Sequence, residues 1–170
     1  MNCKLSIVVL VVAAIIATAG GNYVKLATKN LAGLHCVTEA AYNLQDTVDT
    51  FKYDLNLCDA TATATANYVL DNANDVVRIL TTLVDVSKNV CNNANYDAAT
   101  DARKTPTPSC VENVTKQAEK LKTAVWYTIK EIAAVKKGNS CVTMNLTNLK
   151  LNFFDFKNLI RKCVDVARKV

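Results

Sequence analysis

The sequence contains few of the residues that catalytic sites use. It has one histidine, four glycines and two prolines among 170 residues, and aromatic residues make up 6% of the chain. His35 cannot pair with a nucleophilic cysteine if every cysteine is oxidised, and no glycine-rich phosphate loop or C-x-x-C zinc pair occurs. The acidic residues form no distinctive pair of the glycosidase type. We therefore predict that the protein is not an enzyme and holds no metal or cofactor.

Long apolar runs are absent after the first twenty residues. Lys4 precedes an unbroken apolar run over residues 7–16, and an A-x-A cleavage site ends at Ala19. This pattern predicts a secretory signal peptide over residues 1–19. A membrane anchor is the alternative, but the run is too short to span a bilayer. We expect residues 20–170 to form one soluble, exported domain that acts outside the cell.

Cysteine is plentiful by comparison. The chain has seven cysteines, and Cys3 would leave with the signal peptide. The six that remain are Cys36, Cys58, Cys91, Cys110, Cys141 and Cys163. An even number of cysteines in an oxidising compartment predicts three disulfides.

Proline and glycine are rare enough for long helices, and the apolar residues have a helical period. Four segments carry apolar residues at alternating steps of three and four. The first has Leu34, Val37, Ala41, Leu44, Val48, Phe51, Leu55 and Cys58, and the second has Val69, Ala73, Val76, Leu80, Leu83, Ser87 and Val90. The third has Val111, Val114, Ala118, Leu121, Val125, Thr128, Ile132 and Val135. The fourth has Val142, Leu146, Leu149, Phe153, Phe156, Ile160, Cys163, Ala167 and Val170. Each of these seams predicts the face by which one helix packs on its neighbours.

The connections between the four helices predict how they pack. Two are short, near 59–65 and 138–141, and one is longer, at about 92–108. Short connections make successive helices antiparallel neighbours. We therefore predict an all-α fold, an up-down-up-down four-helix bundle of long helices stapled by three disulfides. A two-stranded coiled coil is the alternative, which secretion, chain size and internal disulfides disfavour.

Local signals predict some of the helix ends. Ser109 and Glu112 match a capping box at the start of the third helix. Residues 59–65 suit a turn, although their alanines favour some helix. The stretch from Tyr23 is expected to extend the first helix.

Equal cysteine spacing predicts two of the disulfides. Cys36 and Cys58 enclose twenty-one residues, and so do Cys141 and Cys163. In the predicted bundle the first and fourth helices are adjacent and antiparallel. Equal rise along both helices then brings Cys36 level with Cys163 and Cys58 level with Cys141.

The two remaining cysteines, Cys91 and Cys110, would close the longer loop between the second and third helices. The main alternative joins Cys36 to Cys91 and Cys110 to Cys163, and keeps the bridge between Cys58 and Cys141. Six cysteines allow fifteen connectivities, so the spacing favours one pairing without excluding the others.

Charge is unevenly distributed along the chain. Residues 20–99 have five Lys/Arg and nine Asp/Glu, whereas residues 100–170 have fourteen Lys/Arg and six Asp/Glu. This division has two interpretations: the two halves form solvated faces that attract each other, or the basic half docks on an anionic surface. Few aromatics, no nucleic-acid motif and secretion argue against a nucleic-acid partner.

Two further patterns suggest surface or pocket roles. Asn113 and Asn145 each begin an N-x-S/T sequon and are candidate glycosylation sites if their side chains are exposed. An aromatic cluster suggests a hydrophobic pocket between helices, although core packing is the simpler interpretation. Its members are Phe51, Trp126, Tyr127, Phe153, Phe154 and Phe156.

The cysteine layout resembles that of a family of secreted insect proteins. The matching residues are Cys36 and Cys58 with Phe51 and Tyr53, and Cys141 and Cys163 with Phe156 and Leu159. They are similar to the C-x21-C pairs of proteins bearing the domain named after the tsetse midgut Glu-Pro-repeat (EP) protein. The chain would be a divergent member, because eighteen residues separate its middle cysteines and no Glu-Pro repeat follows. The resemblance implies a secreted protein of gut, haemolymph or reproductive fluid with no enzymatic role.

Together these features predict a non-catalytic extracellular binding protein, with defence among its expected roles. Its partner would be an extracellular protein or an anionic surface. A carrier of small hydrophobic, lipid-like ligands within the bundle is the alternative, and an inhibitor of a secreted enzyme is a third possibility.

Overall fold

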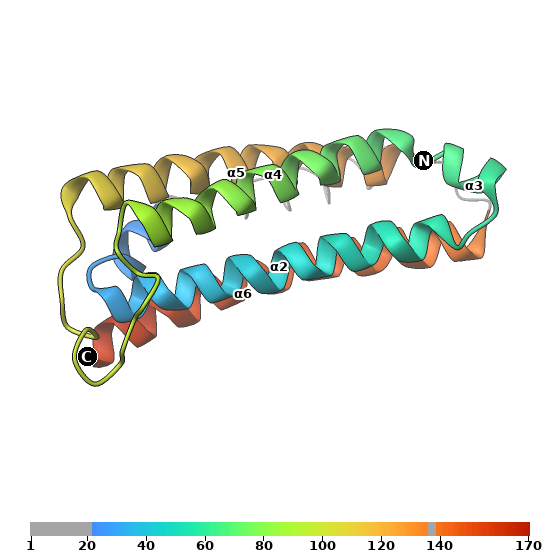
Figure 1. Ribbon diagram of the computed structural model, residues 1–170. Helices are drawn as coiled ribbons and strands as arrows, with labels where there is room; N and C mark the ends of the chain where they lie inside the picture. The colour runs from blue at the N-terminus through green and yellow to red at the C-terminus, as the bar shows by residue number, and fades with distance from the viewer. Residues whose placement is uncertain (1–21, 136–138) are drawn as a thin grey trace.

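The computed structural model describes residues 22–135 and 139–170, which form helices joined by turns and loops (Figure 1). The elements are α2 (Leu31–Asn56), α3 (Ala60–Ala64), α4 (Asn67–Asn89), α5 (Pro108–Ala134) and α6 (Ser140–Lys169). A further helical stretch covers residues 22–27. These described residues contain no strand, so the predicted all-α class is confirmed. The predicted signal peptide, residues 1–19, lies outside the described residues.

The long helices lie in two layers. Figure 1 shows α2 beside α6 in one layer and α4 beside α5 in the other. Between the layers, the backbones of α2 and α4 come close together, whereas those of α5 and α6 stay farther apart. The connection that contains α3 lies at one end of the molecule, and the loop between α4 and α5 lies at the other. The layers are therefore closest together along α2 and α4 and farther apart along α5 and α6.

The predicted apolar seams form the core. Every seam position predicted for the first helix is buried, and Leu34, Leu55 and Leu80 are completely buried. Burying one such side chain contributes roughly 1.5–3 kcal/mol to stability. Two seam ends are exposed, since Val90 is 39% exposed and Val170 is 38% exposed. Each of these valines follows the last residue of its helix. The other seam positions that are not fully buried are half-buried: Val111, Ile132, Val135, Phe156 and Ala167.

The first predicted helix is interrupted, so the expectation that the stretch from Tyr23 extends it is wrong. The chain turns after residues 22–27 before α2 begins. Asn30 explains the break, because its Oδ1 accepts a hydrogen bond from the Gly33 N–H at 2.9 Å and so caps a new helix. Asn30 Nδ2 also donates to the Ala167 carbonyl of α6 at 2.8 Å. One asparagine thus begins α2 and binds the end of α6.

The first turn of α2 is enclosed by the loop that precedes α5. The Leu31 N–H donates to the Lys104 carbonyl at 2.8 Å, and the Ala32 N–H donates to the Ala102 carbonyl at 3.2 Å. A helix start leaves such donors without partners in its own helix. The loop therefore supplies acceptors that allow this helix end to be buried.

Two other boundaries differ from the prediction. Thr107, and not Ser109, caps α5, because its Oγ1 accepts a hydrogen bond from the Cys110 N–H at 3.2 Å. The proline that follows suits the first helical position, where no N–H is needed. The 59–65 segment, expected mainly as a turn, contains the short helix α3, which Asp59 caps. The alanines of this segment thus have more influence than its threonines.

A polar cluster lies within the close contact of α2 and α4. The Thr38 and Ser87 hydroxyl oxygens are 2.7 Å apart and buried. Asn93 Nδ2, from the following loop, donates to Ser87 Oγ at 3.1 Å. Buried hydrogen bonds of this kind favour one register over others, because a shifted helix would leave the polar groups without partners.

Three disulfides join Cys36–Cys163, Cys58–Cys141 and Cys91–Cys110. This pairing agrees with the equal-spacing argument and differs from the alternative that joins Cys36 to Cys91. The first two bridges link opposite ends of α2 and α6, with Cα atoms 5.4 and 5.9 Å apart, so these helices are antiparallel. The third links the end of α4 to the start of α5. Each layer is therefore cross-linked internally, and no bridge between described residues joins one layer to the other.

Candidate functional site

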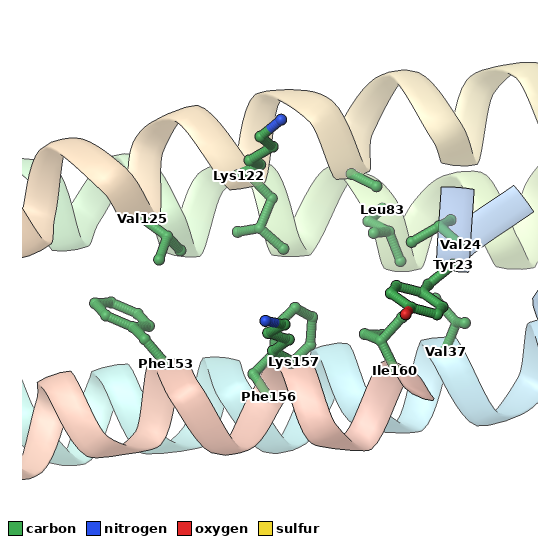
Figure 2. A pocket seen from close by; sticks show the side chains of 12 residues that line it. Tyr23, Val24, Val37, Leu83, Lys122, Val125, Phe153, Phe156, Lys157 and Ile160 are labelled. Atoms are coloured by element: carbon green, nitrogen blue, oxygen red, sulfur yellow. The ribbon is translucent and has the colours of Figure 1, made fainter. Parts of the chain in front are cut away.

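An apolar cavity of about 70 Å³ lies where α5 faces α6, beside the N-terminal helical stretch (Figure 2). From α5 it is lined by Ala118, Leu121, Lys122 and Val125, and from α6 by Phe153, Phe156, Lys157 and Ile160. Tyr23, Val24, Val37 and Leu83 complete the lining. Apart from the two lysines, these side chains are apolar or aromatic. The cavity therefore offers water few hydrogen-bond partners and suits an apolar guest.

The cavity lies at the loosely packed edge of the two layers. The disulfides hold α2 to α6 and α4 to α5, and the core residues hold α2 to α4. No equivalent link between described residues draws α5 toward α6. Small changes in the distance between the layers can therefore change the cavity without breaking a bridge or the α2–α4 core.

Both helices place a lysine inside an apolar stripe. On α5 the stripe is Ala118, Leu121, Lys122 and Val125, and on α6 it is Phe153, Phe156, Lys157 and Ile160. The two sets share the spacing i, i+3, i+4 and i+7, which places four residues on one face of a helix. An apolar residue is usual at the position that each lysine occupies. The lysine within each apolar stripe can be seen in the sequence, but the spacing of apolar residues did not predict a role for either lysine.

The two lysines are placed differently. In Figure 2 the Lys157 nitrogen lies in the gap between the layers, whereas the Lys122 nitrogen points away from it. Burial lowers the pKa of the Lys157 ammonium group, and the nearby Arg161 guanidinium lowers it further. Arg161 lies over the Tyr23 ring, with its guanidinium carbon 5.3 Å from the ring centroid. The α6 side of the cavity thus has two cations close together, with a cavity-lining tyrosine beneath one of them.

The predicted aromatic cluster is divided among several environments. Phe153 and Phe156 meet at the cavity, whereas Phe51 is buried in the core away from it. Tyr127 is 48% exposed and makes an edge-to-face contact with Trp126. Phe154, Trp126 and Tyr127 do not line the cavity. The simpler interpretation, core packing, holds for Phe51 and Phe153, which are both buried, and Phe153 also lines the cavity together with the half-buried Phe156.

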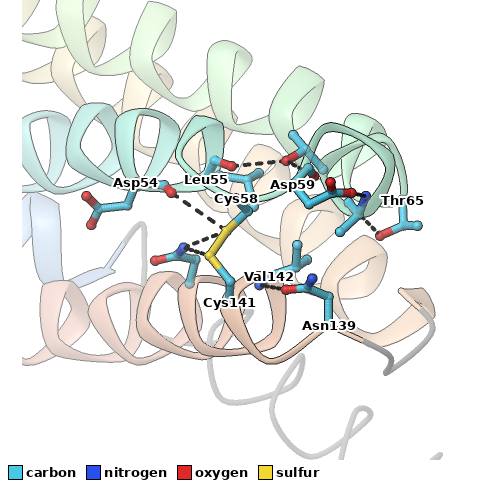
Figure 3. Close-up of a disulfide and its surroundings, with 11 residues drawn as sticks. Asp54, Leu55, Cys58, Asp59, Thr65, Asn139, Cys141 and Val142 are labelled. Atoms are coloured by element: carbon cyan, nitrogen blue, oxygen red, sulfur yellow. Dashed lines mark hydrogen bonds between the residues drawn. A yellow bond between two sulfur atoms is a disulfide. The ribbon is translucent and has the colours of Figure 1, made fainter.

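The two sequon asparagines differ in accessibility. Asn113 is partly exposed, and its Nδ2 donates to the Ser109 carbonyl at 2.8 Å. Asn145 is only 7% exposed, and its Nδ2 lies 3.6 Å from Cys58 Sγ. This sulfur belongs to the Cys58–Cys141 bridge, which Figure 3 shows. A glycan on this nitrogen would not fit the packing, so Asn145 does not meet the condition of exposure on which its candidacy depends. Asn113 stays a candidate site.

His35, the single histidine, has a structural contact. Its ring stacks on Tyr96 with the centroids 4.3 Å apart and the planes at 19°. Tyr96 belongs to the loop between α4 and α5, so the contact attaches this loop to α2. The described residues include no group of three or more His, Cys, Asp or Glu side chains placed to hold a metal ion.

Charge is divided between the two sides of the molecule. α2 has one Lys/Arg and four Asp/Glu, whereas α6 has six Lys/Arg and two Asp/Glu. The Lys52–Asp49, Arg78–Asp75 and Arg168–Asp165 ion pairs each join residues of one helix. Because each pair joins opposite charges within one helix, these pairs do not change the difference in net charge between α2 and α6. The cavity therefore opens beside the most basic helix.

No helix within residues 22–135 and 139–170 is long and apolar enough to cross a membrane. Comparisons of the chain with protein-family models, with curated protein sequences and with solved structures found no match.

Proposed function

We propose that this protein is a secreted, non-catalytic binding protein that carries a small hydrophobic molecule in the cavity between α5 and α6. The observation that supports this best is that an apolar cavity lies where the backbones of α5 and α6 are farther apart than those of α2 and α4. A ligand there would replace weak helix contacts with its own apolar contacts, and it could enter without disrupting the α2–α4 core.

The fold that we propose for this carrier is an up-down-up-down four-helix bundle made of α2, α4, α5 and α6. The antiparallel α2–α6 pair and the connections at alternating ends in Figure 1 support this topology. Bundles of this kind commonly place ligand sites between facing helices. A cavity between two of the four helices is consistent with that arrangement.

We propose an extracellular location for the carrier. The three disulfides favour an oxidising compartment, and the predicted signal peptide and the Asn113 sequon point the same way. The resemblance to insect secreted proteins with the tsetse EP-protein domain supports a role in gut, haemolymph or reproductive fluid. A glycan at Asn113 would lie near the start of α5, at the end of the molecule opposite α3.

Calorimetric titration of the oxidised protein with octan-1-ol tests the carrier function, because this ligand is apolar and uncharged. We expect saturable binding and shifts of the Leu121 and Val125 methyl NMR signals, since both residues line the cavity. Ala118→Leu should weaken binding by about tenfold or more by filling the cavity. Ala133→Leu makes the same change at an exposed position of α5 and should have no effect. Absence of saturable binding to the folded protein would reject the proposal.

A second candidate function is docking of the basic side on an anionic surface. The excess of six Lys/Arg over two Asp/Glu on α6 favours it. Such docking should weaken steeply with salt, since exposed charges are screened within about 10 Å at 0.1 M ionic strength. Binding to phosphatidylserine vesicles but not phosphatidylcholine vesicles, lost at 0.5 M NaCl, would support it. Equal binding to both kinds of vesicle, or none, would reject it.

A further inference from the structure

Lys157 occupies a position that packing alone does not explain. A lysine on an apolar stripe usually covers apolar surface with its stem and extends its nitrogen into water. In Figure 2 the Lys122 nitrogen points away from the gap between the layers, whereas the Lys157 nitrogen lies in it. The lowered pKa of Lys157, caused first by burial, agrees with this placement. Its charge is thus kept beside an apolar cavity.

The charge of Lys157 has no acidic neighbour along its own helix. The side chains within reach on one face of a helix are those three and four positions away. For Lys157 these are Phe153, Phe154, Ile160 and Arg161. Arg161 is itself a cation and opposes the protonated form of Lys157. An anion placed between the two side chains would reduce this repulsion and would lie at the edge of the cavity.

The size of the cavity limits the apolar part of a guest. A group the size of a water molecule or a methylene needs about 10–15 Å³ of such volume. A cavity of about 70 Å³ therefore has room for roughly five to seven methylene-sized groups. A straight chain of six to eight carbons, with its polar end outside the cavity, matches this space.

We infer that the ligand is a medium-chain fatty acid, whose alkyl chain fills the α5–α6 cavity and whose carboxylate binds Lys157 and Arg161. The inference rests on the proposed carrier function and adds the class of ligand and its orientation. The chain contacts Leu121, Val125 and Phe153, and the carboxylate lies on the α6 side of the cavity. Arg161 contributes through a guanidinium that is already positioned over Tyr23.

Three ligands with the same chain length but different head-group charges separate the contribution of charge to binding from the contribution of the apolar chain. We would titrate the oxidised protein with octanoate, octan-1-ol and octylammonium at pH 7.5 by calorimetry. Octanoate should bind about tenfold to a hundredfold more tightly than the alcohol, as expected for a hydrogen-bonded charge pair. Octylammonium should bind more weakly than the alcohol. Among the carboxylates from butanoate to dodecanoate, affinity should stop rising near eight carbons.

Substitutions of single lysines test whether Lys157 binds the carboxylate head group of the ligand. Lys157→Met keeps most of the apolar stem and should weaken octanoate binding by about tenfold to a hundredfold, and should change octan-1-ol binding much less. Lys162→Met removes an exposed charge from the same helix and serves as the control. With [1-¹³C]octanoate as the ligand, NMR measures the pKa of its carboxyl group. This pKa should fall when the ligand binds to the unaltered protein, and it should fall less when the ligand binds to the Lys157→Met variant.

The possible outcomes have different meanings. Equal affinity for octanoate and octan-1-ol, unchanged by Lys157→Met, would overturn the fatty-acid inference and leave the carrier function standing. Failure of all three ligands to bind the folded protein would overturn both. Light scattering that shows a dimer, which Ala118→Leu converts to monomer, would also overturn both, because a second copy would then cover the cavity. Selective, Lys157-dependent octanoate binding to a monomer supports the inference.

Discussion

At the scale of single residues, folding places the Lys157 ammonium group beside apolar side chains, where it is partly shielded from water. Burial, and then the Arg161 guanidinium, lower its pKa below the ordinary lysine value of 10.5. When folding lowers the pKa of a lysine, the charged side chain destabilises the folded state. The effect is complete at pH values below the folded pKa. It disappears once the pH exceeds the unfolded pKa, because the side chain is then neutral in both states.

Lys157→Met should therefore stabilise the ligand-free protein slightly at pH 7, by well under about 1 kcal/mol, because solvent screens much of this partly exposed charge. The gain should shrink as the pH rises toward 10.5, because the unaltered protein then loses the unfavourable charge as well. Urea unfolding at pH 7 and pH 10 measures both quantities. A less stable variant, or a gain that does not change with pH, would contradict the prediction. Lys162→Met, at an exposed position, should change stability by less than about 0.5 kcal/mol.

Gly33 is a position where one added methyl group should not fit. A Cβ there would collide with the Ala27 carbonyl oxygen and lie 2.6 Å from the Ala167 Cβ. Gly33→Ala should therefore lower the free energy of unfolding by about 1–3 kcal/mol. In an unobstructed helix the same change would instead raise stability. Chemical denaturation followed by circular dichroism gives the sign.

A second variant tests the cause of this effect. Adding Ala167→Gly to Gly33→Ala removes one of the two close neighbours but not the Ala27 backbone oxygen. We expect only partial recovery of stability, since the backbone cannot move without disturbing the turn before α2. Full recovery would show that the side-chain contact was the main obstacle.

At the scale of helices, the ends depend on hydrogen bonds that the apolar pattern does not specify. The start of α2 depends on an asparagine and on carbonyl groups from a loop about seventy positions away in the sequence. The start of α5 depends on Thr107. A helix of this length gains most of its stability from its buried face, so its caps adjust the boundary and do not decide whether it forms.

The two candidate caps of α5 can be distinguished by substitution. Thr107→Ala removes the acceptor of the Cys110 N–H and should lower stability by about 1 kcal/mol. Ser109→Ala should change it by less than about 0.5 kcal/mol, because Ser109 is exposed and its hydroxyl meets only Asn113 Nδ2, at 3.4 Å. Parallel thermal and urea unfolding would compare them. A larger loss for Ser109→Ala would restore the predicted capping box.

At the scale of the whole molecule, the disulfides cross-link each layer and leave the edge between α5 and α6 without a bridge. Two bridges lie in the α2–α6 layer and one in the α4–α5 layer. The polar Thr38–Ser87 contact and the core residues of α2 and α4 hold the layers together. The fold can therefore be rigid within each layer and still accept a guest between α5 and α6.

Removing bridges should show unequal contributions. When the Cys58–Cys141 bridge is intact, the Cys36–Cys163 bridge still closes a loop made of residues 36–58 and residues 141–163. The chain-entropy model predicts that closing a loop of this length stabilises the fold by about 4 kcal/mol. Cys91–Cys110, with a sequence separation of 19, receives about 3 kcal/mol. Replacing each pair with alanines and measuring urea unfolding gives the two losses. A larger loss for Cys91–Cys110 would contradict this order and would show that the α4–α5 loop matters more than loop length indicates.

Much of the fold could be predicted because it depends on repetition along one chain. The steps of three and four that place Leu34, Leu80 and Leu149 on apolar faces are a local property of a helix, and all three residues are buried. The equal spacing of Cys36–Cys58 and Cys141–Cys163 is also a one-dimensional measurement, and it leads to the observed bridges once two helices are antiparallel.

The candidate site could be predicted only in part. Phe153 and Phe156 were suspected because aromatic residues gather near them in the sequence. Tyr23 and Leu83 were not, because they reach the cavity from distant segments. Asn145 has the same local sequon pattern as Asn113, yet the neighbouring disulfide buries it. Accessibility depends on what other segments cover, which a local pattern does not contain.

The sequence alone determined that this chain forms long helices, which faces of them are apolar and which cysteines can meet. These properties follow from the period of the helix and from its constant rise per residue. The tertiary structure decided that α5 and α6 pack loosely, that a cavity lies between them and that Lys157 lies at its edge. Those features depend on how closely two separate surfaces approach each other. That distance is set by the balance of all the contacts between the layers.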